Sequence, residues 1–445
     1  MAVVNPVNLN LGRYAKPMET IKLTRDIGKV TQVTGFLLRG YIPAACIGAI
    51  CEIFPTAGHK PFLAEVVGFE DRHVLLMPLG EMRGVGLGSK IVLIKSQATV
   101  RVGKDLLGRV LNALGDPIDG LGELSAAEET SIYAETVNPL RRPPIDKPLG
   151  LGIRSIDGLI TIGRGQRVGV MAGSGVGKSV LMGMMARSTH ADVNVIALVG
   201  ERGREVREFI EHTLGKEGLK KSVIVVATSD QSPLMRMRAA FLASSVAEYF
   251  CYQGKEVLMM MDSVTRFAMA QREIGLNIGE PPASKGYTPS VFSLLPKLLE
   301  RAGTFDGHGS ITGLYTVLVE GDDMDDPIGD AVRSIVDGHI VLERSLAQKG
   351  HYPAVDVLQS TSRVMRNVVS PEQVAQARFM RENLAIYKEA EDLINIGAYK
   401  AGSNPKIDLA IRMHPLLEDF LRQDVGETTD FETTKALMGQ ICGVG

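Results

Sequence analysis

The chain has 445 residues, which at roughly 150 residues per domain predicts about three domains and a large buried core. Its 49 basic and 51 acidic side chains give a net charge of −2, so no overall positive field favours binding to nucleic acid or to an anionic membrane. Hydrophobic residues make up 45% of the chain and charged residues 22%, and this composition excludes a largely disordered protein.

Membrane, secreted and zinc-stabilised proteins are disfavoured by the residue pattern. No stretch reaches the roughly 18 apolar residues of a membrane-spanning helix, and the first residues lack the basic start and apolar run of a secretory signal. The four cysteines, Cys46, Cys51, Cys251 and Cys442, form no Cys-x-x-Cys pair. We therefore expect reduced thiols and no structural zinc.

The N-terminal part predicts an arm followed by a β domain. Residues 1–25 have too few periodic apolar positions to predict a helix, and we treat them as an arm. Residues 26–97 contain β-like runs separated by Gly, Pro and Asp, with no stretch of helical period between them, which predicts a small β-barrel or sandwich. The runs lie at 28–40, 46–54, 62–69, 73–79 and 89–96.

Residues 98–369 predict a long α/β region. A turn is expected at 115–117, and a proline-rich crossing follows at 138–150. Beyond it, strand candidates alternate with helical patterns, as a mostly parallel sheet with crossover helices requires. The strand candidates are 167–171, 193–199, 223–227, 256–261 and 311–319, and the helical patterns are 178–190, 203–214, 235–252 and 289–302.

Residues 370–445 predict a helical domain. One helix is expected to begin at Ser370-Pro371-Glu372, an N-cap residue followed by proline in the first turn. Further helices are predicted at 388–398 and 408–421.

Residues 172–179 read A-G-S-G-V-G-K-S, a variant of the phosphate-loop pattern G-x-x-x-x-G-K-[ST] with Ala172 in the first position. A strand candidate precedes the segment and a helical pattern follows it, which is the context that the motif requires. The loop N–H groups and the helix N-terminus attract phosphate, so Lys178 is expected to reach the β- and γ-phosphates of ATP and Ser179 to coordinate Mg²⁺. The residues assigned to nucleotide binding are Gly173, Ser174, Gly175, Val176, Gly177, Lys178, Ser179 and Val180.

Two carboxylates are candidates for the chemistry around this loop. Asp262 ends an apolar run 84 residues after Lys178 and is predicted as the second Mg²⁺ ligand, although strands also end in Asp when it caps a helix. Glu201 follows the strand candidate 193–199, and a βαβ unit would place it near the loop as the group that polarises water. On spacing alone, a surface acid explains Glu201 equally well. Arg202 is a candidate contact for the γ-phosphate.

With these residues located, the chain resembles the catalytic subunits of rotary ATPases, and among them the flagellar and type III secretion export ATPases. The resemblance covers more than nine-tenths of the chain, from about residue 26 onward. The segment GERGREV matches the one that contains the family's catalytic glutamate, which implies that role for Glu201. The other matching segments are 320–344 and 351–365, typical of the superfamily, and 279–303 and 389–408, specific to the export branch.

The resemblance implies two further site residues and an assembly. Tyr352 occupies the position of an aromatic that stacks on adenine, and Arg363 aligns with an arginine finger that reaches into the neighbouring subunit's site. The implied fold is α/β, with an N-terminal β-barrel, a central RecA-like P-loop domain and a C-terminal helical domain, assembled as a homohexameric ring. The implied function is Mg²⁺-dependent ATP hydrolysis that powers protein export through the flagellar type III secretion apparatus, with ATP and Mg²⁺ as cofactors.

The implied partners are a stator-like export regulator, a stalk protein, export-gate membrane components, export substrates and their chaperones, and no nucleic acid. The implied location is cytoplasmic, peripheral to the inner membrane. The family usually carries a more helical N-terminal arm, and the first residues of this chain depart from it because they have little helical pattern.

Three alternatives stay open. One is the same enzyme in a virulence-type secretion system. Another is a catalytic subunit of an F- or V-type ATP synthase, although the C-terminal helices lack an acidic D-E-L-S-E-E-D-like segment. The last is a hexameric RNA translocase, although residues 26–96 have few aromatics and no basic cluster for nucleic acid.

Overall fold

The structure is a computed structural model that describes residues 26–56, 58–125, 128–319 and 326–443. The predicted arm, residues 1–25, lies outside the described residues. The chain divides into two compact units at Ala98 and Thr99, and each unit is described by itself.

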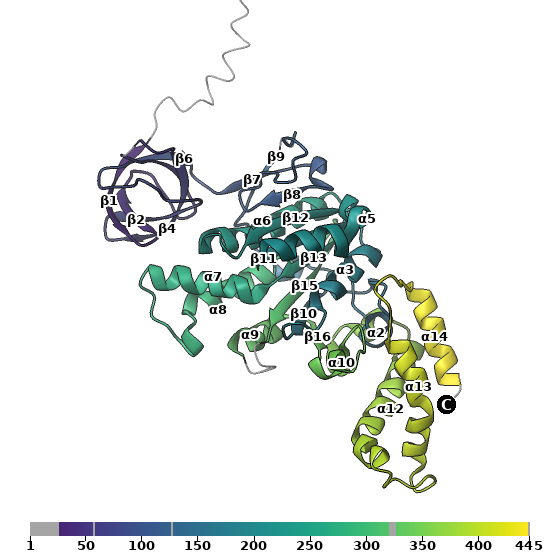
Figure 1. The fold of residues 1–445 in the computed structure, drawn as a ribbon. Helices are drawn as coiled ribbons and strands as arrows, with labels where there is room; N and C mark the ends of the chain where they lie inside the picture. Colours follow the sequence, from purple (N-terminus) through teal and green to yellow (C-terminus); the bar gives the residue numbers. More distant parts are fainter. Residues whose placement is uncertain (1–25, 57, 126–127, 320–325, 444–445) are drawn as a thin grey trace, which may run out of the picture. The chain divides into compact units, whose positions relative to one another are not determined.

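The first unit is a closed antiparallel barrel with the strand order β1-β2-β5-β4-β3-β6 (Figure 1). The predicted run 28–40 forms two strands because Gly35, with φ +56°, turns the chain and places Thr34 opposite Leu37. Side chains that point inward, such as Leu38, Ile53 and Leu76, are fully buried. The strands are β1 (Ile27–Thr34), β2 (Leu37–Tyr41), β3 (Ile50–Phe54), β4 (Phe62–Glu70), β5 (His73–Pro78) and β6 (Lys90–Lys95).

The second unit is built on a sheet with the order β17-β16-β10-β15-β13-β11-β12-β8. All neighbouring strands along this path run parallel except β17, which is antiparallel to β16. The strands are β8 (Val110–Asn112), β10 (Arg167–Ala172), β11 (Val193–Glu201), β12 (Ser222–Thr228), β13 (Glu256–Asp262), β15 (Ser310–Leu318), β16 (Gly338–Leu342) and β17 (Val355–Ser362). β14 (Gly303–Thr304) pairs with β15, and β7 (Thr99–Val102) pairs with β9 (Glu128–Ser131).

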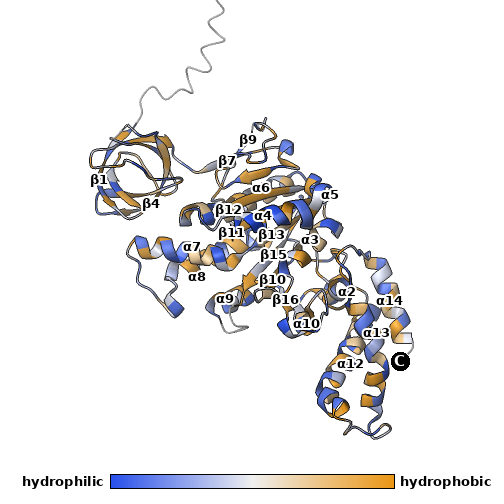
Figure 2. Ribbon diagram, in the orientation of Figure 1, coloured by the Kyte–Doolittle hydropathy of each residue, from blue (hydrophilic) through white to orange (hydrophobic). Residues whose placement is uncertain are grey.

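Helices cover both faces of this sheet, which is why its central strands are hydrophobic along almost their whole length (Figure 2). Met259 of β13 contacts Ser244 on one face, whereas its neighbour Met260 belongs to the same core cluster as Leu181. The first face is covered by α6 (Pro233–Tyr252) and α7 (Val264–Asn277), and the second by α3 (Lys178–Ser188).

The remaining helices connect the strands or follow the sheet. They are α2 (Arg154–Leu159), α4 (Gly203–Glu208), a π-helix (Phe209–Leu214), α5 (Gly215–Lys220), α8 (Pro289–Leu299), α9 (Pro327–Ile335), α10 (Arg344–Gln348), α11 (Met365–Val368), α12 (Pro371–Asn395), α13 (Pro405–Leu421) and α14 (Phe431–Gly443). Short 3-10 turns lie at Lys104–Leu106, Pro139–Arg141 and Ser284–Gly286. The α/β fold class predicted from the sequence, with a barrel before the sheet and helices after it, is confirmed.

Two of the predicted helices have different bounds in the structure. The helix predicted at 388–398 is the second half of α12, because no Gly or Pro interrupts the chain before Gly397, whose φ is +71°. The helix predicted at 203–214 is divided into α4 and a π-helix, and α5 continues it.

Candidate active site

The phosphate loop connects β10 to α3, as the motif predicts. Gly175 and Gly177 have φ values of +79° and +91°, a left-handed conformation that residues with a side chain rarely adopt. Ser174 and Gly175 are exposed, and Gly177 is the N-cap residue of α3. The loop can therefore present backbone N–H groups to an anion at a helix N-terminus.

Lys178, the first residue of α3, contacts one carboxylate and approaches a second. Its ammonium donates a hydrogen bond to Oδ1 of Asp262, and Nζ lies 4.0 Å from Oε1 of Glu201. The side chains of Lys178, Glu201 and Asp262 are only 11%, 16% and 5% exposed. The lysine, the metal-ligand candidate and the water-polarising candidate thus meet in one nearly buried cluster.

The strand register explains why these residues meet. Asp262 ends β13 and pairs with Leu198 of β11, so the strands carry Asp262 and Glu201 to the same carboxyl edge of the sheet. The register of β11 shifts between Val199 and Glu201 around Gly200, whose φ is +72°. A side chain on Gly200 would also lie 2.9 Å from Cβ of Arg266, so glycine is required at this irregularity.

The cluster changes the protonation of Glu201. Burial and the nearby negative charge of Asp262 raise the pKa of Glu201 to about 7, while the positive charge of Lys178 opposes this shift. A carboxyl group with a pKa near neutrality exchanges protons readily at physiological pH, as a group that assists the deprotonation of water must.

Tyr352 lies against the phosphate loop. A Cβ placed on Gly177 would be 3.5 Å from Cε1 of Tyr352, so the ring borders the end of the loop. The Tyr352 side chain is 46% exposed and Val180 on the first turn of α3 is 38% exposed, so both present an accessible apolar surface beside the loop. This arrangement suits the stacking of a planar base.

Gln423, which follows α13, holds the Tyr352 segment from the C-terminal side. Its backbone N–H donates to the carbonyl of Tyr352 at 2.9 Å, and its side chain donates to the carbonyl of Gly152 at 2.7 Å and accepts from the N–H of Arg154 at 2.9 Å. The Gln423 side chain is buried, so these bonds are shielded from water. The sequence alone does not reveal Gln423, because a single glutamine after a helix has no signature.

Arg202 is not part of the buried cluster. Its guanidinium is 78% exposed and pairs with Glu205 at 3.0 Å. It projects from the N-cap position of α4, next to Glu201 in sequence.

Arg363 lies at the edge of the sheet opposite to the phosphate loop. Ser362 at the end of β17 pairs with Gly338 at the start of β16, which in turn runs parallel to β10. Arg363 is therefore level with the beginning of β10, whereas Lys178 follows its end, a separation of roughly 17 Å along the strand. The exposed Arg363 side chain donates to the carbonyl of Arg333 at 3.4 Å, and it cannot reach the Lys178 of its own chain.

Comparison with known proteins decides the family. Residues 152–362 match the model of the ATP synthase alpha/beta family, nucleotide-binding domain, and residues 369–440 match the T3SS EscN ATPase C-terminal domain. The flagellum-specific ATP synthase of Bacillus subtilis is 54% identical over 94% of this chain and 95% of the relative. The chain belongs to the flagellar and type III secretion ATPase family.

Further relatives and a solved structure agree with this family. The type 3 secretion system ATPase of Xanthomonas euvesicatoria is 47% identical over 96% of each chain. The structure of the assembled ATPase EscN from the type III secretion system of enteropathogenic E. coli superposes with a TM-score of 0.87 at 46% identity, over 93% of this chain and 99% of that chain. This export-type chain is an ATPase with a nucleotide as its substrate. Among its described residues, no helix is both long enough and apolar enough to cross a membrane.

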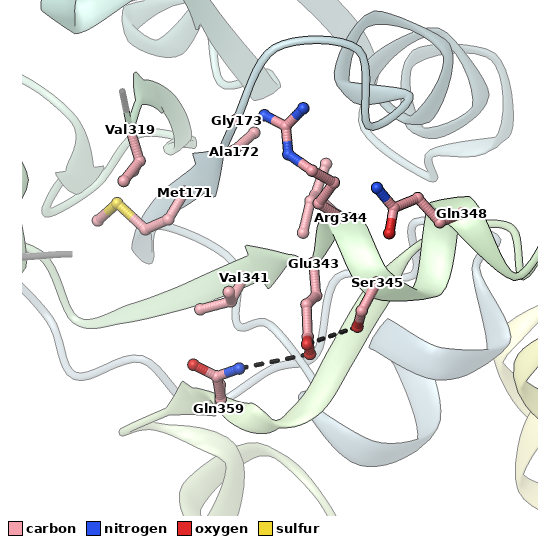
Figure 3. A pocket seen from close by; sticks show the side chains of 11 residues that line it. Met171, Ala172, Gly173, Val319, Val341, Glu343, Arg344, Ser345, Gln348 and Gln359 are labelled. Carbon is pink, nitrogen blue, oxygen red and sulfur yellow. Dashed lines mark hydrogen bonds between the residues drawn. The ribbon is translucent and has the colours of Figure 1, made fainter. Parts of the chain in front are cut away.

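A pocket of about 380 Å³ adjoins the start of the phosphate loop of this ATPase (Figure 3). Ala172 and Gly173 form one wall, and Glu343 and Arg344 at the end of β16 form another. Glu343 accepts hydrogen bonds from Ser345 and Gln359, as the dashed lines in Figure 3 show. The lining does not include Lys178, Glu201 or Asp262, so this pocket is separate from their cluster.

Proposed function

We propose that this ATPase hydrolyses ATP with Mg²⁺ to power protein export by the flagellar type III secretion apparatus. The observation that carries the chemistry is the position of Lys178 between Asp262 and Glu201 at the end of the phosphate loop. The flagellar assignment is supported by identities of 45–54% to six flagellum-specific ATP synthases, of which the highest is 54%, against 47% and 45% to two type 3 secretion system ATPases.

In this proposal each side chain acts on a different part of the substrate. Lys178 and the N–H groups of residues 173–180 bind the phosphates. Glu201 orients and polarises the attacking water, and Tyr352 stacks on the adenine. Arg202 approaches the γ-phosphate only if its exposed side chain turns away from Glu205.

The residues near Lys178 suit a magnesium ion. Mg²⁺ binds oxygen ligands and usually one or two carboxylates with substrate phosphates, and this site offers the carboxylate of Asp262 and the exposed hydroxyl of Ser179. When bound, the ion neutralises charge on the phosphates. Asp262 and Ser179 would hold the ion, and Lys178 would then be free to contact phosphate.

We also propose that identical subunits complete each other's sites in a closed homohexameric ring. Because Arg363 lies at the edge of the sheet opposite to Lys178, it can serve as an arginine finger only in a neighbouring subunit. A solved structure of EscN in complex with its central stalk EscO supports a stalk partner for this chain. The other proposed partners are a stator-like regulator, export-gate membrane components, export substrates and chaperones, at the cytoplasmic side of the inner membrane and without nucleic acid.

We propose the domain division 1–25, 26–97, 98–369 and 370–445. Family matches over 152–362 and 369–440 support separate central and C-terminal domains.

The proposed function is tested with Lys178→Ala and the control Lys216→Ala. Lys216 is exposed on α5, so its replacement makes the same charge change away from the cluster. We expect Lys178→Ala to abolish Mg²⁺-dependent ATP hydrolysis and Lys216→Ala to preserve it, and near-normal turnover by Lys178→Ala would overturn the site. In the native host, Lys178→Ala should prevent filament assembly, whereas normal flagella with loss of effector secretion would favour the virulence-type system.

A further inference from the structure

Thr316 is a buried polar residue in the middle of the sheet that the proposed mechanism does not use. It lies on β15, between the strand that leads to the phosphate loop and the strand that ends in Asp262. Its side chain is fully buried, and its hydroxyl donates to Oδ1 of Asp262 at 2.7 Å. A buried hydroxyl needs a partner, and here the partner is the candidate metal ligand.

The strand register places Thr316 and Asp262 side by side. Met261 pairs with Tyr315, so the next residues of the two strands, Asp262 and Thr316, are also neighbours and face the same side of the sheet. This is the side of Lys178, because Lys178 contacts the same carboxylate. Tyr315 points to the other side, where its hydroxyl donates to the carbonyl of Leu299.

Both side-chain donors of Asp262 end on the same oxygen. Lys178 and Thr316 share Oδ1, which leaves Oδ2 without a side-chain hydrogen bond among the described residues. When Lys178 turns to the phosphates of a substrate, Thr316 is the donor that still holds the carboxylate. A hydroxyl on a rigid central strand can keep Oδ1 turned inward and Oδ2 turned toward the ion.

We infer that Thr316 is a positioning residue that orients Asp262 for Mg²⁺. This inference rests on the proposed function, because it gives Asp262 the role of metal ligand. Loss of a hydrogen-bond partner of a metal ligand typically lowers metal affinity 10–100-fold. The same bond would also exist if Asp262 only satisfied a buried threonine, and metal affinity distinguishes the two cases.

The test measures the binding of a fluorescent ADP analogue to the full chain, first in EDTA and then across a Mg²⁺ titration. For Thr316→Val, which keeps the shape but removes the hydroxyl, we expect unchanged binding in EDTA and a Mg²⁺ half-point raised about 10-fold. Thr316→Ser restores the hydroxyl and should return the half-point to the wild-type value. The control is Thr312→Val on the same strand, since the Thr312 hydroxyl accepts from the N–H of Gly165 instead.

Two results would overturn the inference: a wild-type Mg²⁺ half-point in Thr316→Val, or a loss of binding already in EDTA, which would indicate a general packing role. If Thr316→Val does not fold, Thr316→Ala removes the same hydroxyl without added bulk, and the same half-point is measured. If the wild-type chain binds the analogue with no dependence on Mg²⁺, the metal assignment in the proposed function fails, and that result is separate from any effect of Thr316.

Discussion

At the scale of single residues, the site is organised by one positive charge between two negative ones. Lys178 donates a hydrogen bond to Asp262, while burial and Asp262 together raise the pKa of Glu201. A substrate that carries phosphates would compete with Asp262 for Lys178, so we expect substrate entry to rearrange the ion pairs of the free protein. The two acids are thereby prepared for different tasks although they lie beside the same lysine.

Replacing Glu201 by Gln should separate binding from turnover. Glutamine keeps the size and hydrogen-bonding ability of the side chain but cannot accept a proton from water, so we expect turnover to fall about 10²–10⁴-fold while nucleotide binding persists. Steady-state hydrolysis and equilibrium binding measure the two effects, with Glu208→Gln on the exposed side of α4 as the control. A collapse of binding in Glu201→Gln would instead identify Glu201 as a structural residue.

Replacing Tyr352 by Ala should act mainly on KM. The ring borders the loop at Gly177 and is half exposed, so its loss removes a stacking surface without disturbing Lys178 or Glu201. We expect KM for ATP to rise several-fold, about 1 kcal/mol of stacking, with kcat mostly retained. Tyr352→Phe keeps the ring and should behave like the wild type. A large loss of kcat at unchanged KM contradicts the role in base stacking.

The motif predicted Lys178 and the apolar run predicted Asp262, whereas Glu201 was assigned only with the resemblance. The structure brings the three side chains together. Thr316 and Gln423 could not be found in this way. A threonine in an apolar strand and a glutamine after a helix gain their roles only from the strand register and from contacts with distant segments.

At the scale of elements, a buried carboxylate secures the segment that precedes α2. The fully buried Asp157 accepts hydrogen bonds from the N–H groups of Leu151 at 3.0 Å and Gly152 at 2.8 Å. Burial raises the pKa of Asp157 to about 7, although these N–H groups act in the opposite direction. In the unfolded chain the carboxyl of Asp157 has an ordinary pKa near 4, so it loses its proton at a much lower pH.

This difference predicts a pH dependence of stability. Because the pKa of Asp157 is higher in the folded chain, its contribution is fully present below about pH 4 and is lost as the pH rises to about 7, at most about 4 kcal/mol. Asp157→Asn keeps an acceptor oxygen but does not titrate. We expect the free energy of unfolding of the variant, relative to the wild type, to increase between pH 5 and pH 8 in urea titrations. A constant difference across this range would show that Asp157 is ionised in the folded chain.

The elements that were predicted accurately are those whose signals lie in neighbouring residues of the sequence. The strand and helix around the phosphate loop were predicted within a few residues, because glycines and the change of hydrophobic period mark them. The strands β16 and β17 were missed. Their directions are set by pairing with β10 and with each other, which no local signal reveals. The position of Arg363 depends on that reversal, so it could not be derived from spacing.

At the scale of the whole molecule, the separation of Arg363 from Lys178 predicts complementation between two inactive variants. Arg363→Ala should lose about 10³–10⁵ in kcat while it still binds nucleotide, because the developing charge on the phosphoryl group lacks its guanidinium. When Arg363→Ala and Glu201→Gln subunits form mixed rings, an Arg363→Ala subunit keeps its own Glu201 and receives Arg363 from its neighbour. Hydrolysis should therefore partly return.

The exposed neighbour Arg366 provides the control, since Arg366→Ala should remain active alone. Rings of mixed composition, verified by differential tags on the two variants, that are as inactive as their parents would refute the finger assignment. Arg363→Lys should restore little activity, because an ammonium does not reproduce the planar guanidinium with its several donors.

The hydrogen bonds of Gln423 connect the C-terminal helices to the Tyr352 segment beside the phosphate loop. Gln423, the second residue after α13, donates to the carbonyl of Tyr352, and its side chain is hydrogen-bonded to the segment at the start of α2, so it connects the three segments. A displacement of α13 would therefore reach the Tyr352 ring beside the phosphate loop through the hydrogen bonds of Gln423. A partner that displaces the C-terminal helices would then change the rate of nucleotide release.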